Sequence, residues 1–274
     1  MPEWSLPPPI VLAESANLPA SIAVGALDHP PLPDGCEIGL IALATDHAIE
    51  NEMRLFLPPG TGPGGVNLYT TRVPAPDRFG PESLRATEAE LARAASLLVP
   101  GSRLDVIAYG CTSATAAIGE DAVFAQIRKG RPDIACTSPM TAADAALRRL
   151  DARKIVLVTP YPDAVHAIVA RDLERRDFTL IDQANFGIDE DSAITRVSPQ
   201  RIADAVRDRQ LSEADAVFVA CTSLRTATIV ETLENELKMP VISSNRALAW
   251  HALALASNSP EPLPLPPPAR GGGS

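Results

Sequence analysis

Two cysteines of this sequence stand in the same short motif, and a pair of thiols can move protons or form covalent adducts. Cys111 and Cys221 each begin a Cys-Thr-Ser triplet, and an aspartate stands six residues before each cysteine. A single cysteine at the end of a strand is more often a packing residue than a reactive one. Packing alone does not require the same triplet twice, so the repetition indicates that both thiols take part in chemistry.

The expected position of each triplet, where a strand leads into a helix, favours a reactive thiolate. The helix dipole and free backbone N–H groups can lower the pKa of a thiol there from about 8.5 to near or below neutrality. The residues after each cysteine offer hydroxyl and N–H donors to a carboxylate or to a developing enolate oxygen. These residues are Thr112, Ser113, Thr222 and Ser223.

Two such thiols suit two kinds of isomerisation. In the first, one thiolate removes a proton from a carbon atom and the other thiol delivers a proton to the opposite face, which inverts the configuration. In the second, one thiolate adds to an alkene, the adjacent bond rotates, and elimination returns the other geometric isomer. Neither route requires a metal or a cofactor, and we expect the chain to use none.

The elements that must position the triplets are predicted by an alternation of strand-like and helix-like segments. Short β-branched runs alternate with segments of helical period, the pattern of βα units around a parallel sheet. The expected strands are residues 38–43, 68–73, 105–109, 155–158, 178–181, 216–219 and 241–243. The expected helices are residues 81–98, 114–127, 141–150, 162–175, 199–209, 225–237 and 247–256. The fold class is therefore α/β.

The triplets belong to an internal repeat that predicts two halves with the same βα order. The strand that leads to Asp46 parallels the strand that leads to Tyr161, and residues 132–138 parallel residues 240–245. We expect two flavodoxin-like or Rossmann-like parallel-sheet subdomains related by a pseudo-twofold axis. Ligands bind at the carboxyl ends of such strands, so the active site is expected in the cleft between the subdomains.

Both ends of the chain are richer in proline than the segment between them. Residues 1–35 are expected to form a Pro-rich arm, residues 36–150 the first subdomain and residues 151–258 the second. Residues 259–274 form a Pro/Gly-rich tail, and its final Gly-Gly-Gly-Ser is typical of an added linker.

Charge and composition exclude several classes of function. The formal net charge of −10 and the lack of a basic run argue against a nucleic-acid partner. The sequence has neither a secretory signal nor an apolar run long enough to span a membrane, so we expect a cytoplasmic protein with reduced thiols. The four cysteines match no zinc or iron–sulfur spacing, and Cys36 and Cys136 are expected to be structural.

These motifs resemble those of the aspartate/glutamate racemase superfamily, in particular its branch of maleate cis-trans isomerases and arylmalonate decarboxylases. The resemblance runs from about residue 37 to residue 256. It is carried by IGLIALATDHAIE at 38–50, YGCTS at 109–113, VTPY at 158–161, ACTS at 220–223 and PVISSN at 240–245. Within the branch, the sequence is most similar to racemase-like proteins encoded with ectoine-utilisation enzymes, which share the strings ATDH, YGCTS, CTSLR and SSNxALAWH.

The resemblance implies roles for the residues of both triplets. Cys111 and Cys221 fall on the catalytic pair of the superfamily, and Tyr161 falls on its substrate-contacting tyrosine. The four threonine and serine residues fall on its carboxylate-binding and oxyanion-binding positions. The superfamily also implies that the terminal helix packs back on the first half. Arylmalonate decarboxylases keep the second cysteine and have glycine at the first position, so Cys111 disfavours decarboxylation.

One position separates this sequence from maleate isomerases. They have an asparagine where Asp46 stands and another near Ser192. An aspartate at position 46 would repel a second carboxylate and could pair with an ammonium group, which favours an amino acid or its derivative over maleate. Asp46 could equally cap the following helix through its side chain.

Three hypotheses follow from the sequence. The first is inversion at Cα of a small amino acid or related carboxylate, and the second is cis-trans isomerisation of an unsaturated dicarboxylate. The third is a two-lobed carboxylate-binding protein that uses its cysteines only for packing; two thiols with pKa values near or above 8.5 would favour it. In each case we expect a small-molecule ligand and a homo-oligomer.

Overall fold

The computed structural model describes residues 35–57 and 65–257. These residues form two parallel four-stranded sheets. The first sheet has the order β2-β1-β3-β4, with β1 at Cys36–Leu43, β2 at Val66–Val73, β3 at Val106–Gly110 and β4 at Ala135–Thr137. The expected arm and tail at the two ends of the chain lie outside the described residues, apart from Gly35.

The second sheet repeats the order of the first. It runs β6-β5-β7-β8, with β5 at Lys154–Thr159, β6 at Thr179–Asn185, β7 at Ala216–Val219 and β8 at Val241–Ser243. The inner strands β3 and β7 are completely buried, because helices cover both faces of a parallel sheet and leave room only for apolar side chains. The predicted α/β class with two parallel sheets is confirmed.

The helices differ from the predicted ranges where local geometry interrupts them. They are α1 Ile49–Phe56, α2 Pro81–Ala86, α3 Leu91–Leu97, α4 Thr112–Ile118, α5 Glu120–Gly130, α6 Pro139–Arg149, α7 Asp163–Arg175, α8 Asp191–Ile194, α9 Pro199–Arg207, α10 Val230–Leu237 and α11 Ser244–Ala256. The expected helix 114–127 is divided at Gly119, whose φ of 96° suits glycine. The expected helix 81–98 contains the 3₁₀ turn Thr87–Glu90 between α2 and α3.

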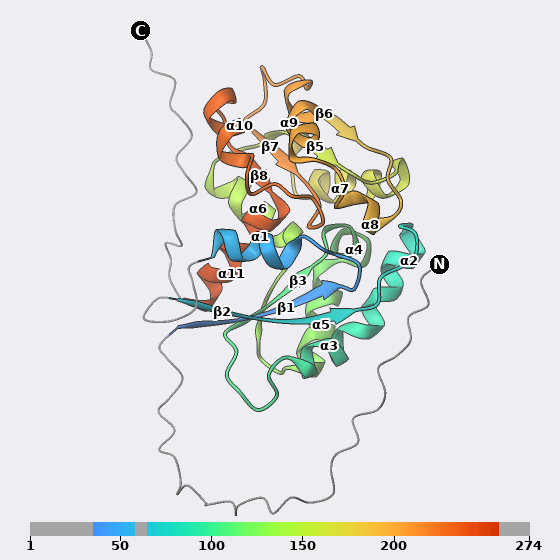
Figure 1. Cartoon of the computed structure of the whole chain (residues 1–274), viewed down its shortest axis with the longest axis vertical. Coiled ribbons are helices and arrows are strands. Elements are labelled where there is room, and N and C mark those ends of the chain that lie inside the picture. Colours follow the sequence, from blue (N-terminus) through green and yellow to red (C-terminus); the bar gives the residue numbers. More distant parts are fainter. Residues whose placement is uncertain (1–34, 58–64, 258–274) are drawn as a thin grey trace, which may run out of the picture. The chain divides into compact units, whose positions relative to one another are not determined.

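Helix α11, although last in the sequence, packs on the first sheet. It contacts β1, β3 and β4 and runs beside α6, and Figure 1 shows it beneath α1 next to the first sheet. Leu248 and Ala252 of α11 join Ile38 and Leu40 of β1 in one buried apolar cluster. Helix α6, which ends the first half, contacts β8 of the second sheet. The last helix of each half therefore contacts the sheet of the other half.

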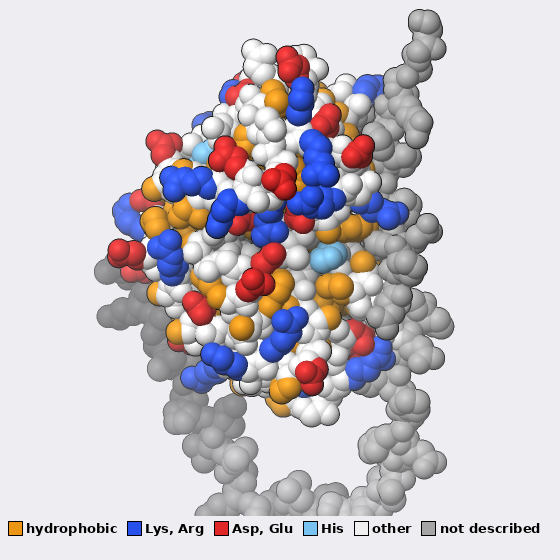
Figure 2. Space-filling model, turned by 180° about the vertical axis from the view of Figure 1, so that it is seen from behind, with side chains coloured by type: hydrophobic (Ala, Val, Ile, Leu, Met, Phe, Trp, Pro, Cys, Tyr) orange, Lys and Arg blue, Asp and Glu red, His pale blue; other side chains and the backbone are white. Residues whose placement is uncertain are grey.

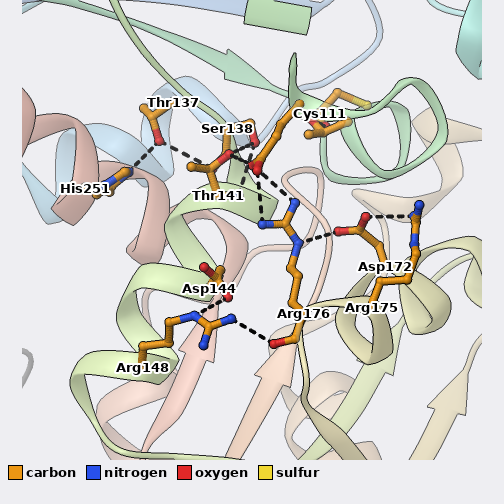
Figure 3. A network of polar contacts seen from close by, with 12 residues as sticks. Cys111, Thr137, Ser138, Thr141, Asp144, Arg148, Asp172, Arg175, Arg176 and His251 are labelled. Carbon is orange, nitrogen blue, oxygen red and sulfur yellow. Dashed lines mark hydrogen bonds and ion pairs between the residues drawn. The ribbon is translucent and has the colours of Figure 1, made fainter. Parts of the chain in front are cut away.

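A polar network also joins the two halves (Figure 3). Glu120 at the start of α5 accepts a hydrogen bond from Thr141 of α6 at 2.7 Å and pairs with Arg176, which follows α7, at 3.2 Å. Arg176 pairs in turn with Asp172 of α7 at 2.7 Å. These contacts cross from the first half to the second, so the halves are fixed to each other by charge as well as by apolar packing.

The surface carries mixed charges. On the face seen in Figure 2, Lys and Arg side chains are interspersed with Asp and Glu side chains. The ion pairs of the described residues include Arg207 with Glu236 at 2.8 Å. Among the described residues, no helix is both long enough and apolar enough to cross a bilayer.

Candidate active site

The two triplets lie at the carboxyl ends of the inner strands, and the second contacts the residue immediately before the first. Cys111 follows β3, Cys221 follows β7 after one intervening residue, and each is 3% exposed. The Thr222 hydroxyl of the second triplet donates to the carbonyl oxygen of Gly110, the residue before Cys111, at 3.1 Å. The structure therefore brings both cysteines to one site at the junction of the halves.

The surroundings of the two cysteines are less alike than the sequence predicts. Cys111 is the N-cap residue of α4, as expected for a strand-to-helix turn. After Cys221, residues 222–229 form turns, and α10 begins only at Val230. The sequence-based expectation of a helix from residue 225 is therefore wrong, and Cys221 does not lie at a helix N-terminus.

The predicted lowering of the thiol pKa values is also wrong for this structure. Burial raises the pKa of Cys111 to about 12, and the N–H of Ala114 and the hydroxyl of Ser113 offset this only in part. Burial and then the charge of Asp191 raise the pKa of Cys221 well above its ordinary value. Withdrawal from water outweighs the few donors that reach the sulfur atoms, so both thiols are neutral in this state.

Asp46 is a buried carboxylate with one satisfied and one open oxygen. It follows β1 and is 1% exposed. Its Oδ1 accepts hydrogen bonds from the N–H groups of Ala48 at 2.8 Å and Ile49 at 2.9 Å, at the start of α1. Its Oδ2 is buried without a hydrogen-bond partner among the described residues. The capping role considered for this residue accounts for one oxygen and leaves the other available.

Asp191, a residue that the sequence did not single out, lies in the same site. It begins α8 and is 3% exposed. Thr45 donates to its Oδ2 and Ser223 donates to its Oδ1, both at 2.6 Å. Burial first, and then the charge of Asp191, raise the pKa of Asp46. The only sequence signal was the resemblance near Ser192, one residue further on.

The hydroxyls expected to bind a carboxylate are mostly engaged within the protein. Thr112 pairs with the hydroxyl of Ser244 at 2.9 Å, Thr222 donates to Gly110, and Ser223 donates to Asp191. The Ser113 hydroxyl lies 3.8 Å from the sulfur of Cys111. The carboxylate-binding roles of these four residues stay predictions, and Ser113 is the residue whose hydroxyl is least committed elsewhere.

Tyr161 lies between the thiols and the surrounding apolar core. It is 1% exposed and meets Phe79 edge to face, with ring centroids 6.0 Å apart. Burial, followed by proximity to Cys221 and Cys111, raises the pKa of its hydroxyl well above the ordinary value. The structure thus places this tyrosine beside both thiols, and its contact with substrate stays a prediction.

The other candidate ligands lie apart from this cluster. Cys36 is half-buried at the start of β1, and Cys136 is buried on β4, where its thiol donates to the carbonyl of Ile134 at 3.5 Å. Within residues 35–57 and 65–257, no group of three or more His, Cys, Asp and Glu side chains is arranged to hold a metal ion.

Residues 115–263, more than half of the chain, match the family model described as arylmalonate decarboxylase. The chain belongs to this family. Among its relatives is a maleate isomerase of Nocardia farcinica, 29% identical over 79% of this chain and 88% of that protein. Another is an arylmalonate decarboxylase of Bordetella bronchiseptica, 31% identical over 44% of this chain and 51% of that protein.

A solved structure supports the same relationship. The Nocardia farcinica maleate cis-trans isomerase, in a cysteine-to-serine variant with a covalently bound succinylcysteine intermediate, is 27% identical. It superposes with a TM-score of 0.74 over 81% of this chain and 93% of that one. The relatives are thus enzymes, and they include both isomerases and a decarboxylase. The family match begins after Cys111, so it spans the second triplet and not the first.

Proposed function

We propose that this chain is a two-cysteine isomerase that inverts a small amino acid or related carboxylate at Cα without a cofactor. The observation that carries the proposal is the closeness of the two Cys-Thr-Ser triplets: Thr222 of the second donates a hydrogen bond to the carbonyl oxygen of Gly110, the residue immediately before the first. A carbon atom held between the two sulfur atoms would present a different face to each.

The proposed inversion uses one thiol as base and the other as acid. One cysteine, as thiolate, takes the Cα proton and becomes a thiol, while the electron pair moves into the carboxylate as an enolate. The opposite thiol then donates its proton to the other face of Cα and becomes the thiolate. The atoms and charges balance, and the enzyme ends with its proton on the other cysteine. Ser113, whose hydroxyl lies 3.8 Å from the sulfur of Cys111, would stabilise the enolate oxygen.

The neutral thiols of this structure require an activating step. Taken alone, the raised pKa values of Cys111 and Cys221 match the expectation for a binding protein. However, Asp191 and Asp46 contribute to both shifts, and a substrate that neutralises these carboxylates would lower both pKa values. Reactivity is therefore to be measured with substrate present.

A second candidate is cis-trans isomerisation of the maleate type. The named activity of the Nocardia farcinica relative and its covalent succinylcysteine favour this candidate. The two buried carboxylates Asp46 and Asp191 oppose it, because they would repel a dianion. Decarboxylation, the activity in the family's name, is disfavoured by Cys111, since the resemblance gives glycine at that position in the decarboxylases.

The experiment is a racemisation assay on a panel of amino acids and their N-acyl derivatives, followed by optical rotation. The resemblance to proteins of ectoine utilisation makes the amino acids released in ectoine breakdown the first members of the panel. We expect a substrate whose conversion falls at least about a hundred-fold in C111A and in C221A. The control C136A removes a buried thiol away from the site and keeps full activity.

Two outcomes would contradict the proposal. Conversion of maleate to fumarate with no racemisation of any amino acid would select the second candidate. Absence of both reactions, together with tight binding of a carboxylate, would select the two-lobed binding protein.

A further inference from the structure

Asp46 and Asp191 are two buried carboxylates in one site, and neither forms an ion pair among the described residues. Two arginines that lie by these residues pair with other carboxylates. Arg72 donates to the main-chain carbonyl of Asp46 at 2.8 Å and pairs with Glu50. Arg78 pairs with Asp189. Buried charges in proteins are normally paired, so this site lacks a positive partner.

The hydrogen bonds of the two carboxylates leave one acceptor open. Both oxygens of Asp191 accept from hydroxyls, and Oδ1 of Asp46 accepts from two backbone N–H groups. Oδ2 of Asp46 is fully buried and has no hydrogen-bond partner in the part of the chain that the structure describes. The nearby Thr222 hydroxyl lowers the pKa of Asp46, but it donates its proton to the carbonyl oxygen of Gly110. The charge of Asp46 acts on Cys111 and on Cys221. Asp46 thus lies close enough to both sulfur atoms for its charge to raise their pKa values.

A cavity of about 410 Å³ leads to Asp191 from outside. Its polar lining residues are Thr45, Asp77, Arg78, Glu190, Asp191 and Ser192. Three of these carry a negative charge, and the one positive side chain, Arg78, is paired with Asp189. The cavity that Asp191 lines is thus acidic and attracts cations rather than dicarboxylates.

We infer that Asp46 and Asp191 form a subsite for a cationic group, so that the substrate carries an ammonium or similar cation next to the part that the thiols attack. The cation would donate to the open oxygen of Asp46 and stand beside the charge of Asp191. This inference deepens the proposed function and rests on it for the chemistry at the thiols. It assigns to Asp191 a part in specificity that the sequence did not reveal.

Binding of a cation at this subsite has a consequence for catalysis. The negative charges of Asp46 and Asp191 each contribute to the raised pKa of the two thiols. The other titratable groups beside the sulfur atoms are Tyr161, near both, and Tyr109, near Cys111, and burial raises the pKa of each hydroxyl well above its ordinary value. A bound cation offsets both negative charges, so the substrate itself would ease formation of the thiolate.

The test uses three ligands of similar size that have no stereocentre: 4-aminobutyrate, butyrate and succinate. Each is titrated calorimetrically into wild type, D46N, D191N and the double variant, with D144N as the control, because Asp144 is a half-buried carboxylate of α6 that pairs with Arg148 and not with the site. We expect wild type and D144N to bind 4-aminobutyrate roughly ten-fold or more tightly than the other two. Each site variant should lose most of this preference, and the double variant should bind succinate at least as well.

The inference is overturned if 4-aminobutyrate does not bind measurably, if it binds no better than butyrate, or if both site variants keep the preference. None of the three ligands can show racemisation, so binding is read independently of catalysis. Racemisation by a protein that does not prefer 4-aminobutyrate would contradict this inference and leave the proposed function standing. A preference for 4-aminobutyrate in a protein that racemises no amino acid would contradict the proposed function and leave this inference standing.

Discussion

At the scale of single residues, the acidity of the thiols is decided by burial rather than by their place in the repeat. Sequence position predicted two activated thiols, because a helix N-terminus stabilises a thiolate. The structure gives Cys111 one such N–H, from Ala114, and still raises its pKa to about 12. The degree of burial and the neighbouring Asp191 depend on contacts between distant segments, which no local pattern shows.

The raised pKa of Cys111 predicts slow alkylation in the absence of ligand. At pH 8.5, where about half of an ordinary thiol is ionised, iodoacetamide should modify Cys111 at least about ten-fold more slowly than free cysteine, as measured by mass spectrometry. The neutral thiol is favoured in the folded state, so its contribution to stability is present below about pH 8.5. That contribution is lost as the pH rises toward about 12. Alkylation with a midpoint at or below pH 8.5 would contradict this assignment.

At the scale of elements, the sequence predicts the strands best. Each inner strand is a continuous apolar run, and the predicted range 216–219 coincides with β7. The short strand β4 at Ala135–Thr137 was not among the expected strands, and α8 was not among the expected helices. Helix α1 was expected only through the capping role considered for Asp46, without a range. These segments are short, and long-range packing rather than periodicity determines them.

The start of α10 shows why one boundary was wrong. The residues before it look helical, but their N–H groups bind a distant side chain. Glu52 of α1 accepts hydrogen bonds from the N–H and hydroxyl of Thr226 at 2.9 and 2.8 Å and from the N–H of Ala227 at 2.9 Å. Glu52, 5% exposed, thus holds the turn that follows Cys221.

The contacts of Glu52 predict that E52Q misplaces this turn. The amide NH₂ would face N–H groups that need an acceptor, so we expect a loss of about 1–3 kcal/mol in the free energy of unfolding. We also expect a fall in kcat, because this turn positions Cys221 and also Ser223, which donates to Asp191. Denaturant titration and steady-state kinetics would measure both effects. The matched variant E231Q changes an exposed glutamate of α10 and should alter neither the free energy of unfolding nor kcat. Wild-type kinetics in E52Q would show that the turn does not depend on Glu52 for its position.

At the scale of the whole molecule, the exchange of terminal helices joins the two halves. The internal repeat predicts two similar halves, and the equal strand orders β2-β1-β3-β4 and β6-β5-β7-β8 agree with it. The packing of α11 on the first sheet is an extra contact that the superfamily resemblance implied. By contrast, Asp191 lies in a segment of the second half for which the sequence predicted no helix or strand. Its place in the site depends on contacts with distant residues such as Thr45, which only the folded structure shows.

This exchange predicts that the described halves unfold together. Leu248 of α11 is fully buried against β1, so L248A should cost about 2–5 kcal/mol. Calorimetry should show a single transition that shifts as one in the variant. Two separate transitions, with the second half unaffected by L248A, would show that the halves are independent.

The central claim is that the two thiols act from opposite faces of one carbon atom. It is tested most directly by incubating wild type, C111A and C221A in D₂O with one enantiomer of the substrate and following deuterium at Cα by NMR and mass spectrometry. In wild type, the inverted product should carry deuterium from its first appearance while the remaining substrate keeps hydrogen. Neither cysteine variant should form this product. Absence of deuterium from the product, or its formation at the wild-type rate in either variant, would contradict the account.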